Sequence, residues 1–230
     1  MSSQDTSQTV MKAVFPAFDG FGLALPDSQI PAGTLGLDAK RVLDIAAAAL
    51  LLVVLSPLLA LVSLAIALDS PGPVLFAQRR TGRHGKTFPI FKFRSMHVME
   101  DGYQVIQAVR GDTRITRVGR IIRKLSIDEL PQIFNVLAGQ MSLVGPRPHA
   151  LAHDDYYGAR IANYAQRFAV KPGITGWAQV NGSRGPTPTL DVMQARIDLD
   201  AWYVANADFA LDLLILAKTP LEVLRTRNAH

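Results

Sequence analysis

The strongest hydrophobic pattern in the chain is one uninterrupted apolar segment. From Ile45 to Leu68 no residue carries a charge, and only two serines and Pro57 interrupt the aliphatic side chains. About 24 residues at ~1.5 Å each form about 36 Å of helix, which is enough to cross the hydrocarbon core of a bilayer. A buried helix of a soluble protein is the alternative, but this length and apolarity favour the membrane. We therefore expect a membrane helix over residues 38–69.

Two features indicate that this helix turns back within the membrane. Pro57 follows Ser56 near the middle of the segment, where it removes one helical hydrogen bond and its ring pushes against the preceding turn. Cations flank both ends, since Lys40 and Arg41 precede the segment and the basic stretch 79–86 follows it. Because positive charge is retained on the cytoplasmic side, this favours a helix that enters and leaves by one face. Proline also occurs in spanning helices, so a spanning form stays open at this point.

After the apolar segment, two short stretches have the composition of β-strands. Residues 74–78 and 87–95 flank a turn-rich basic stretch, which predicts a small β-hairpin. Period-two alternation places Lys92 and Arg94 on one face of the second strand and phenylalanines on the other. The two cations either lie on a solvated face or bind a phosphate, and the strand pattern alone does not decide between these.

Two later segments are predicted to be helices at the surface of a membrane. In residues 113–125 the aliphatic side chains form one stripe and arginines cover the other side. Residues 209–217 are apolar, but Asp212 interrupts them and they are too short to span a bilayer; with Leu221, Val223 and Leu224 they predict another helix. Soluble surface helices share such patterns. Next to a membrane helix, we expect the first helix to lie in the interface and the second to lie there or pack against the domain.

Composition and charge restrict the partners. The 230-residue chain has a net charge of +5 and a pI near 9.7, and its excess of cations follows residue 39. This indicates nucleic acid, an anionic lipid surface or a phosphorylated substrate. Without cysteine there is no thiolate zinc site, and the histidines lack metal-motif spacing, so oxygen-bound Mg²⁺ is the default metal. Residues 1–37 predict a weakly ordered extension without a signal-peptide pattern.

Two adjacent carboxylates, Asp128 and Glu129, follow a run of cations over residues 114–124. Carboxylates beside fixed cations suit chemistry on a phosphate, because the cations bind the anion while the acids attack it or hold a divalent metal. The alternative is a helix capping box that starts at Ser126 and uses Glu129 as its reciprocal partner. Pro131 disfavours the box because it would disrupt the first turn. A helix that begins later leaves both acids on the turn before it.

Two further segments offer groups that could bind a phosphate. In Pro146-Arg147-Pro148 the flanking prolines restrict the backbone, which lowers the entropic cost of presenting the arginine. Residues 171–185 form a glycine-punctuated loop that contains Gln179, Asn181 and Arg184 but lacks the P-loop signature. The structural alternatives are a rigid loop with an incidental arginine and a set of turns around a packed tryptophan.

Taken in order, these segments resemble one family over about residues 38–227. The chain resembles the monotopic phosphoglycosyl transferases, the bacterial sugar transferases that begin exopolysaccharide, capsule or O-antigen repeat units. The resemblance rests on five ordered blocks: Ser56-Pro57 in an apolar helix, Lys92-Phe-Arg-Ser-Met96, Asp128-Glu129, Pro146-Arg-Pro148, and Pro172-Gly-Ile-Thr-Gly-Trp-Ala-Gln-Val-Asn-Gly182.

The resemblance implies a compact monotopic α+β fold with a re-entrant helix broken at Ser56-Pro57 and a cytosol-facing catalytic domain over residues 70–227. It implies transfer of a hexose-1-phosphate from a UDP-sugar to a polyprenyl phosphate, usually undecaprenyl phosphate, with release of UMP. The location would be the cytoplasmic face of a bacterial inner membrane, with Mg²⁺ as cofactor. The stretch 177–185 looks most like hexose-1-phosphate transferases, which favours glucose and then galactose.

The resemblance also implies roles for individual residues. Asp128 would attack the β-phosphate, form a phosphosugar–enzyme intermediate and ligate Mg²⁺, and Glu129 would assist through acid–base chemistry or metal organisation. The substrate and phosphate contacts would be Arg123, Arg147, Lys92, Arg94, Gln179, Asn181 and Arg184.

Other functions remain open from the sequence. Within enzymes, the alternative is direct metal-assisted transfer without a covalent intermediate. A membrane-anchored basic module that binds lipid or a partner would explain the cations but not the acid pair, and UMP release from a UDP-sugar separates these readings. Nucleic acid is disfavoured because aromatic residues do not interleave with the basic runs. The oligomeric state stays open, with a homodimer as one option.

Overall fold

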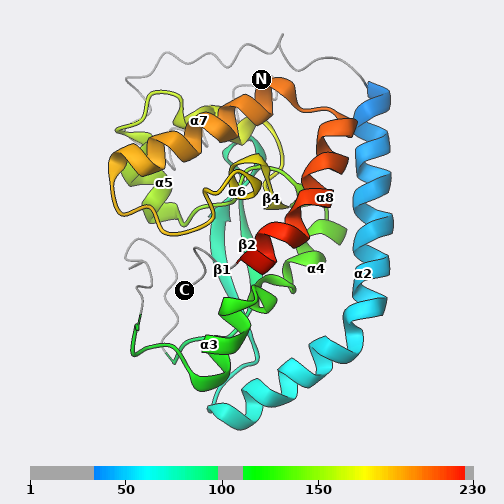
Figure 1. The fold of residues 1–230 in the computed structure, drawn as a ribbon, viewed down its shortest axis with the longest axis vertical. Helices are drawn as coiled ribbons and strands as arrows, with labels where there is room; N and C mark the ends of the chain where they lie inside the picture. The colour runs from blue at the N-terminus through cyan, green and yellow to red at the C-terminus, as the bar shows by residue number, and fades with distance from the viewer. Residues whose placement is uncertain (1–33, 98–110, 226–230) are drawn as a thin grey trace, which may run out of the picture.

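The computed structural model describes residues 34–97 and 111–225, which form helices around two small sheets (Figure 1). The elements in chain order are α2 (Thr34–Asp69), β1 (Leu75–Thr81), η2 (Arg83–Gly85), β2 (Thr87–Phe93), α3 (Arg117–Lys124), η3 (Ile127–Glu129), α4 (Gln132–Leu137), β3 (Ser142–Val144), α5 (Leu151–Gly158), η4 (Tyr164–Ala169), β4 (Gly173–Thr175), α6 (Trp177–Val180), α7 (Leu190–Asn206) and α8 (Phe209–Arg225). The predicted α+β fold class is confirmed. Residues 1–33 of the expected N-terminal extension lie outside the described residues.

One helix, α2, is long and apolar enough to cross a membrane, and it is the only such helix in the described ranges. It bends partway along its length, so that its last turns run in a different direction from its first (Figure 1). Pro57 has no N–H to donate to the carbonyl of Val53, four residues earlier. The Ser56 hydroxyl donates to that carbonyl at 2.8 Å. The Ser-Pro pair therefore interrupts the helical ladder and also satisfies the acceptor that proline leaves open.

The predicted hairpin is present as the antiparallel pair β1–β2, with Thr81 opposite Thr87. Its strand bounds differ from the expectation: β1 continues to Thr81 instead of ending at residue 78, and β2 ends at Phe93 instead of residue 95. The turn is shorter than expected because His84 adopts a left-handed φ of 56°, which lets the chain reverse within a few residues.

The two faces of β2 serve different parts of the molecule. Ile90 is 2% exposed and belongs to the central core, together with side chains of α4, β3 and α8. The next side chain on that face is Lys92, which leaves the core and reaches the acid pair. Phe93, on the opposite face, packs against Val62 and Ile66 in the part of α2 beyond the bend.

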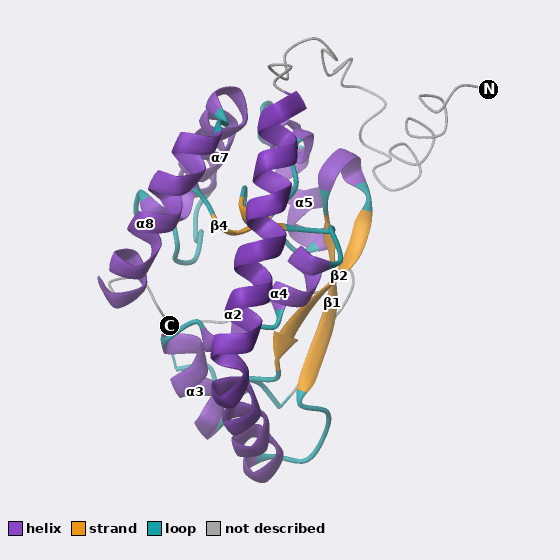
Figure 2. Ribbon diagram, turned by 90° about the vertical axis from the view of Figure 1, so that its right-hand side faces the viewer, coloured by secondary structure: helices purple, strands orange, loops and turns teal. Residues whose placement is uncertain are grey.

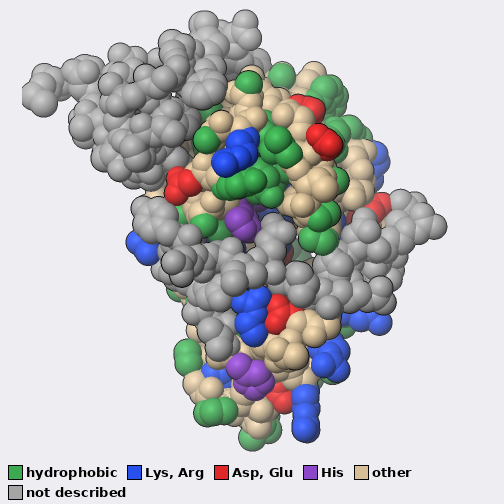
Figure 3. All heavy atoms as spheres, turned by 90° about the vertical axis from the view of Figure 1, so that its left-hand side faces the viewer, with side chains coloured by type: hydrophobic (Ala, Val, Ile, Leu, Met, Phe, Trp, Pro, Cys, Tyr) green, Lys and Arg blue, Asp and Glu red, His purple; other side chains and the backbone are tan. Residues whose placement is uncertain are grey.

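The predicted amphipathic helix over residues 113–125 is present as the shorter helix α3. It begins after Thr116, whose side chain accepts from the amide of Gly119. Ile122 is buried beside the distal part of α2, whereas Ile121 is 62% exposed. Lys and Arg side chains gather on the lower part of the face seen in Figure 3, where α3 lies in Figure 1.

A short parallel pair, β3–β4, brings two loops of the predicted site together. Ser142 pairs with Gly173 in this register. A Cβ atom on Gly173 would lie 2.1 Å from the amide nitrogen of Gly145, so only glycine permits this close approach. The Pro146–Pro148 segment and the glycine-punctuated loop therefore start from adjacent points of one sheet.

Both ends of α2 are attached to the same folded body, along which the helix runs (Figure 2). Near its start, Asp44 accepts from the hydroxyl of Ser142 in β3 at 3.0 Å, and Lys40 forms an ion pair with Asp212 of α8. At its end, Asp69 accepts from a backbone amide of α3 at 3.0 Å. The predicted C-terminal helix is thus α8, whose buried Asp212 serves to bind α2.

Candidate active site

The two predicted catalytic acids lie on a single 3₁₀ turn between α3 and α4. Ser126, just before the turn, has a left-handed φ of 54° and makes no side-chain capping bond, so the capping box does not form. Helix α4 begins only at Gln132. This confirms that the acids precede the helix. Asp128 is 7% exposed, and the side chain of Glu129 is 13% exposed.

Glu129 is held by two cations that come from distant parts of the chain. Its Oε1 accepts from the Nζ of Lys92 in β2 at 2.8 Å. The guanidinium of Arg147 donates two parallel bonds, 2.7 Å to Oε2 and 2.5 Å to Oε1. Such a bidentate pair fixes both groups in one plane. Because a guanidinium has five N–H groups and an ammonium three, both cations keep donors for an additional anion.

The two neighbouring carboxylates have opposite pKa shifts. Burial would raise the pKa of Glu129, but the charges and hydrogen bonds of Arg147 and Lys92 outweigh it and hold that pKa well below the usual range. Burial, reinforced by the charge of Glu129, raises the pKa of Asp128 to about 6, against the opposing charges of Lys92, Arg123 and Arg147. Glu129 is thus a permanent anion, whereas Asp128 titrates close to neutrality.

Asp128 differs from Glu129 in having no direct partner. Its carboxylate makes no hydrogen bond or ion pair within residues 34–97 and 111–225, although three cations lower its pKa from nearby. A carboxylate with free lone pairs, surrounded by cations that are already fixed, can attack an electrophile or ligate a metal. Glu129 therefore holds the cations in place, whereas Asp128 is available to attack an electrophile or to bind a metal.

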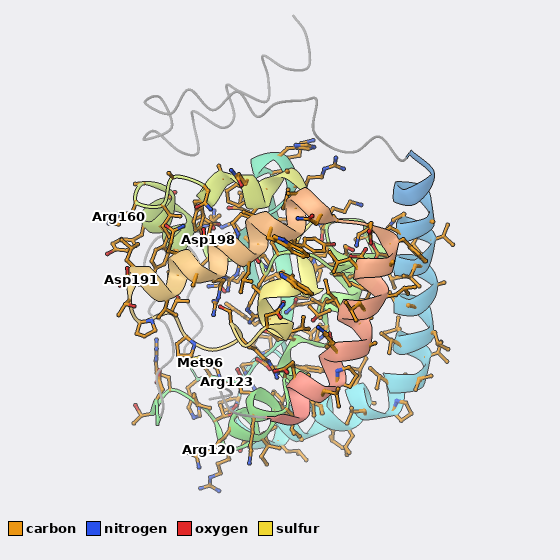
Figure 4. All side chains as sticks on the ribbon, turned by 45° about the horizontal axis from the view of Figure 1, so that its top comes forward. Met96, Arg120, Arg123, Arg160, Asp191 and Asp198 are labelled. Atoms are coloured by element: carbon orange, nitrogen blue, oxygen red, sulfur yellow. The ribbon has the colours of Figure 1, made fainter. Side chains whose placement is uncertain are left out.

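Two more of the predicted arginines border the acid pair. Arg123, in the last turn of α3, lies beside Met96 and donates to its sulfur at 3.8 Å (Figure 4). Its charge acts on Asp128. Arg184 donates to the hydroxyl of Ser126 at the start of the acid turn and to the backbone carbonyl of Glu222 in α8 at 3.2 Å. The structure therefore brings the last turn of α3 and the glycine-punctuated loop to the same site.

Three predicted contacts are engaged elsewhere. Arg94 is buried and donates to carbonyls at the end of α2, including those of Ser70 and, at 2.8 Å, Pro71. Gln179 donates to the carbonyl of Ile174 at 3.1 Å, and Asn181 to that of Trp177 at 2.8 Å. None of the three forms a hydrogen bond or ion pair with the acid pair.

A set of buried polar residues behind Pro146–Pro148 was not predicted from the sequence. Arg167 of η4 donates to the backbone carbonyl of Arg147 and forms an ion pair of 3.1 Å with Asp200 of α7. His149 and Tyr164 complete this set, joined at 2.7 Å. These residues follow no motif spacing. The only signal is that charged residues occur within otherwise apolar stretches.

The donor set at the turn fits a magnesium ion that is shared with a substrate. In the described ranges, no three acidic, histidine or cysteine side chains converge as a metal site. Asp128 alone offers free carboxylate oxygens, since both oxygens of Glu129 accept from cations. Mg²⁺ commonly binds through one or two carboxylates and completes its shell with phosphate oxygens and water.

Comparison with known proteins identifies the family. Residues 36–226 match the family model described as bacterial sugar transferase. The UDP-glucose:undecaprenyl-phosphate glucose-1-phosphate transferase of Caulobacter vibrioides is 55% identical over 205 residues, which cover 89% of this chain and 76% of that protein. The enzyme of the same name from Escherichia coli is 50% identical over 191 residues, covering 83% of this chain and 41% of that protein.

A relative with a different named sugar also matches. The UDP-N-acetylgalactosamine-undecaprenyl-phosphate N-acetylgalactosaminephosphotransferase of Aeromonas hydrophila is 45% identical over 185 residues, covering 80% of this chain and 43% of that protein. The chain thus spans about three quarters of the Caulobacter relative and less than half of the other two. Because the family model matches well over half of this chain, the chain belongs to the bacterial sugar transferase family.

Proposed function

We propose that the protein transfers a hexose-1-phosphate from a UDP-sugar to undecaprenyl phosphate and releases UMP, as the first membrane step of an extracellular or surface polysaccharide. The observation that carries this proposal is the free carboxylate of Asp128 next to a Glu129 whose oxygens hold Lys92 and Arg147. The names of the Caulobacter and Escherichia relatives support glucose as the sugar and undecaprenyl phosphate as the acceptor.

In this proposal Asp128 is the nucleophile. Its carboxylate oxygen forms a bond to the β-phosphorus of the donor, and the bond from that phosphorus to the bridging oxygen breaks, so that UMP leaves with the electron pair. A phosphate oxygen of undecaprenyl phosphate then attacks the same phosphorus and displaces Asp128. Because the pKa of Asp128 is about 6, most of its carboxyl groups are ionised at pH 7 and ready to attack.

The cations stabilise the charge that develops on the phosphoryl oxygens. Arg147 and Lys92 are held by Glu129, and their remaining N–H groups are free to bind the diphosphate without reorganisation during the reaction. The strongly lowered pKa of Glu129 argues against a general acid and for an orienting role. Mg²⁺, held by Asp128 and donor oxygens, would withdraw charge from the phosphorus.

The predicted release of UMP is the direct test. The full chain in lipid nanodiscs should release UMP from UDP-glucose continuously only when undecaprenyl phosphate and Mg²⁺ are supplied, and without the acceptor lipid it should release no more than one UMP per enzyme. UDP-galactose and UDP-N-acetylgalactosamine, tested alongside, measure the sugar preference. If no UDP-sugar of the panel supports release, the enzymatic function is wrong and the basic lipid- or partner-binding module replaces it.

The re-entrant form of α2 at the cytoplasmic face of the inner membrane is part of the same proposal. It is supported by the bend of α2 (Figure 1), by Pro57 inside this helix, and by the attachment of both ends to one body, through Lys40 at the start and Asp69 at the end. The exposed aliphatic side chains of α2, which include Leu50, Val53 and Leu64, would then face lipid.

Single cysteines test this topology, because the natural chain has none. Cysteines at positions 36 and 84 should both be shielded from a membrane-impermeant thiol reagent applied outside intact cells, and both should react after lysis. Labelling of position 36 alone would establish a spanning helix. Pro57→Leu restores the missing N–H and should straighten α2, which would move position 36 toward the labelled state.

A further inference from the structure

The Pro146-Arg147-Pro148 segment can be tied to the body of the protein mainly through its carbonyls. Its two prolines have no N–H, so the three residues provide one backbone donor between them. The carbonyl of Pro146 accepts from the amide of Gly173 at 3.0 Å. The carbonyl of Arg147 accepts from the guanidinium of Arg167. Arg167 thus fixes the backbone of Arg147, whose guanidinium forms the bidentate pair with Glu129.

We propose that Arg167 is a positioning residue for the transfer reaction: by fixing the carbonyl of Arg147, it sets the Arg147 guanidinium against Glu129 and the donor diphosphate. The second part of this statement rests on the proposed function. Arg167 contacts neither acid of the turn, and its effect on the reaction is transmitted through Arg147 alone.

Arg167 is itself held by several buried partners. Its side chain is 2% exposed, and it lies 3.1 Å from Asp200, which is also 2% exposed, and 3.8 Å from Asp154, which is fully buried. Tyr164 donates its hydroxyl to Asp154 at 2.7 Å and accepts from Arg167 at 3.2 Å. Two buried carboxylates thereby compensate one buried guanidinium, and the terminal amino group that faces Asp200 also donates to the carbonyl of Arg147.

His149 supports the same orientation from the segment itself. His149 follows Pro148 directly, and its Nδ1 is in hydrogen-bond contact with the guanidinium of Arg167. Burial, together with the charges of Arg167 and Arg196, lowers the pKa of His149 well below its usual range, so the neutral ring can accept from the guanidinium. Arg167 therefore contacts both residues that flank Pro148, one through its carbonyl and one through its side chain.

The physical consequence is that the backbone atoms from which the Arg147 side chain extends are held in one position. With φ set by proline on either side and the carbonyl fixed by Arg167, the backbone of Arg147 has little freedom to rotate. The two guanidinium bonds to Glu129 then cost less side-chain entropy than they would from a mobile loop. Without the Arg167 bond, the same arginine would sample orientations in which it meets neither Glu129 nor a phosphate.

The test is a double-mutant cycle between Arg167→Lys and Arg147→Lys. The lysine at 167 keeps a buried charge for Asp154 and Asp200, but one ammonium does not reach both the acids and the carbonyl of Arg147. We expect Arg167→Lys to lower kcat/KM for UDP-glucose about tenfold or more, while the midpoint of thermal unfolding changes by only a few degrees. In the Arg147→Lys background, the same change should have almost no further effect.

Arg160→Lys is the matched control, because Arg160 is an exposed arginine at the edge of the molecule that donates to the carbonyl of Tyr156 (Figure 4). It should keep wild-type kcat/KM. If Arg167→Lys also keeps it, or if its effect adds fully to that of Arg147→Lys, Arg167 does not act through Arg147 and the proposal is wrong.

Amide hydrogen exchange separates this proposal from the proposed function. In Arg167→Lys, the amide of Gly173, which donates to the carbonyl of Pro146 at 3.0 Å, should exchange several-fold faster, whereas the amides of α3 should not change. Unchanged exchange at Gly173 would overturn the positioning role whatever the activity. If wild type releases no UMP but this exchange rises, only the catalytic function fails. Should Arg167→Lys not fold, Arg167→Met combined with Asp200→Asn removes one charge of each sign and takes its place.

Discussion

Asp128→Asn is expected to abolish transfer and, at pH 7, to raise the midpoint of thermal unfolding. An amide cannot form the acyl phosphate, so activity should fall by several orders of magnitude. The folded protein holds the pKa of Asp128 at about 6, above its ordinary 3.8, so above pH 6 the ionised carboxylate costs stability on the order of 1–3 kcal/mol. This cost falls as the pH drops from 6 to 3.8, and asparagine does not have it at any pH.

Unfolding of wild type and Asp128→Asn should therefore be compared at pH 7 and pH 4. The variant should unfold several degrees higher at pH 7, and the difference should nearly vanish at pH 4. Glu129→Gln is the matched control with the opposite sign. The pKa of Glu129 is held below its ordinary value, so this carboxylate stabilises the fold at neutral pH, and its loss should lower the midpoint. A wild-type rate in Asp128→Asn would remove the nucleophile from the proposed mechanism.

Arg147→Lys is expected to lower kcat/KM about tenfold or more, equivalent to about 1.4 kcal/mol of transition-state stabilisation. Lysine keeps the positive charge but replaces the planar fork, whose two N–H groups reach both oxygens of Glu129, by a single ammonium. The geometry that aims the cation at the diphosphate is lost, although the net charge of the site is not. Initial rates of UMP release over a range of UDP-glucose concentrations measure the effect.

A lysine substitution that only perturbs the loop would act on folding and leave the reaction intact. The midpoint of unfolding must therefore be measured on the same preparations, with Arg160→Lys as the control for replacing an arginine elsewhere. If Arg147→Lys has the kcat/KM of wild type, the fork is not needed and Arg147 only completes the ion pair with Glu129.

The local features of this protein were largely predictable from its sequence. A run of aliphatic residues determines that α2 is a long apolar helix, and Pro57 determines where its ladder is interrupted, because proline cannot donate a hydrogen bond in any context. Pro131 likewise indicated that the acid pair lies on a turn before α4, as the structure confirms. These outcomes depend on residues a few positions apart, so the chain around them hardly matters.

The partners of the charged side chains were decided only by the tertiary structure. Lys92 and Arg94 alternate on one predicted face, yet Lys92 reaches Glu129 and Arg94 binds carbonyls at the end of α2. The strand ends between them at Phe93, and the carbonyls of Ser70 and Pro71, just beyond the end of α2, accept from the guanidinium of Arg94. No spacing in the sequence indicates where those carbonyls will lie.

The same holds for the arginine that supports the site. The sequence by itself determined that Arg147 is flanked by two prolines and has a restricted backbone. That its carbonyl meets Arg167, and that two buried carboxylates compensate the charge of Arg167, follows from the packing of η4, α5 and α7. A buried ion pair requires partners within a few ångströms, and which residues come that close is a property of the packed chain as a whole.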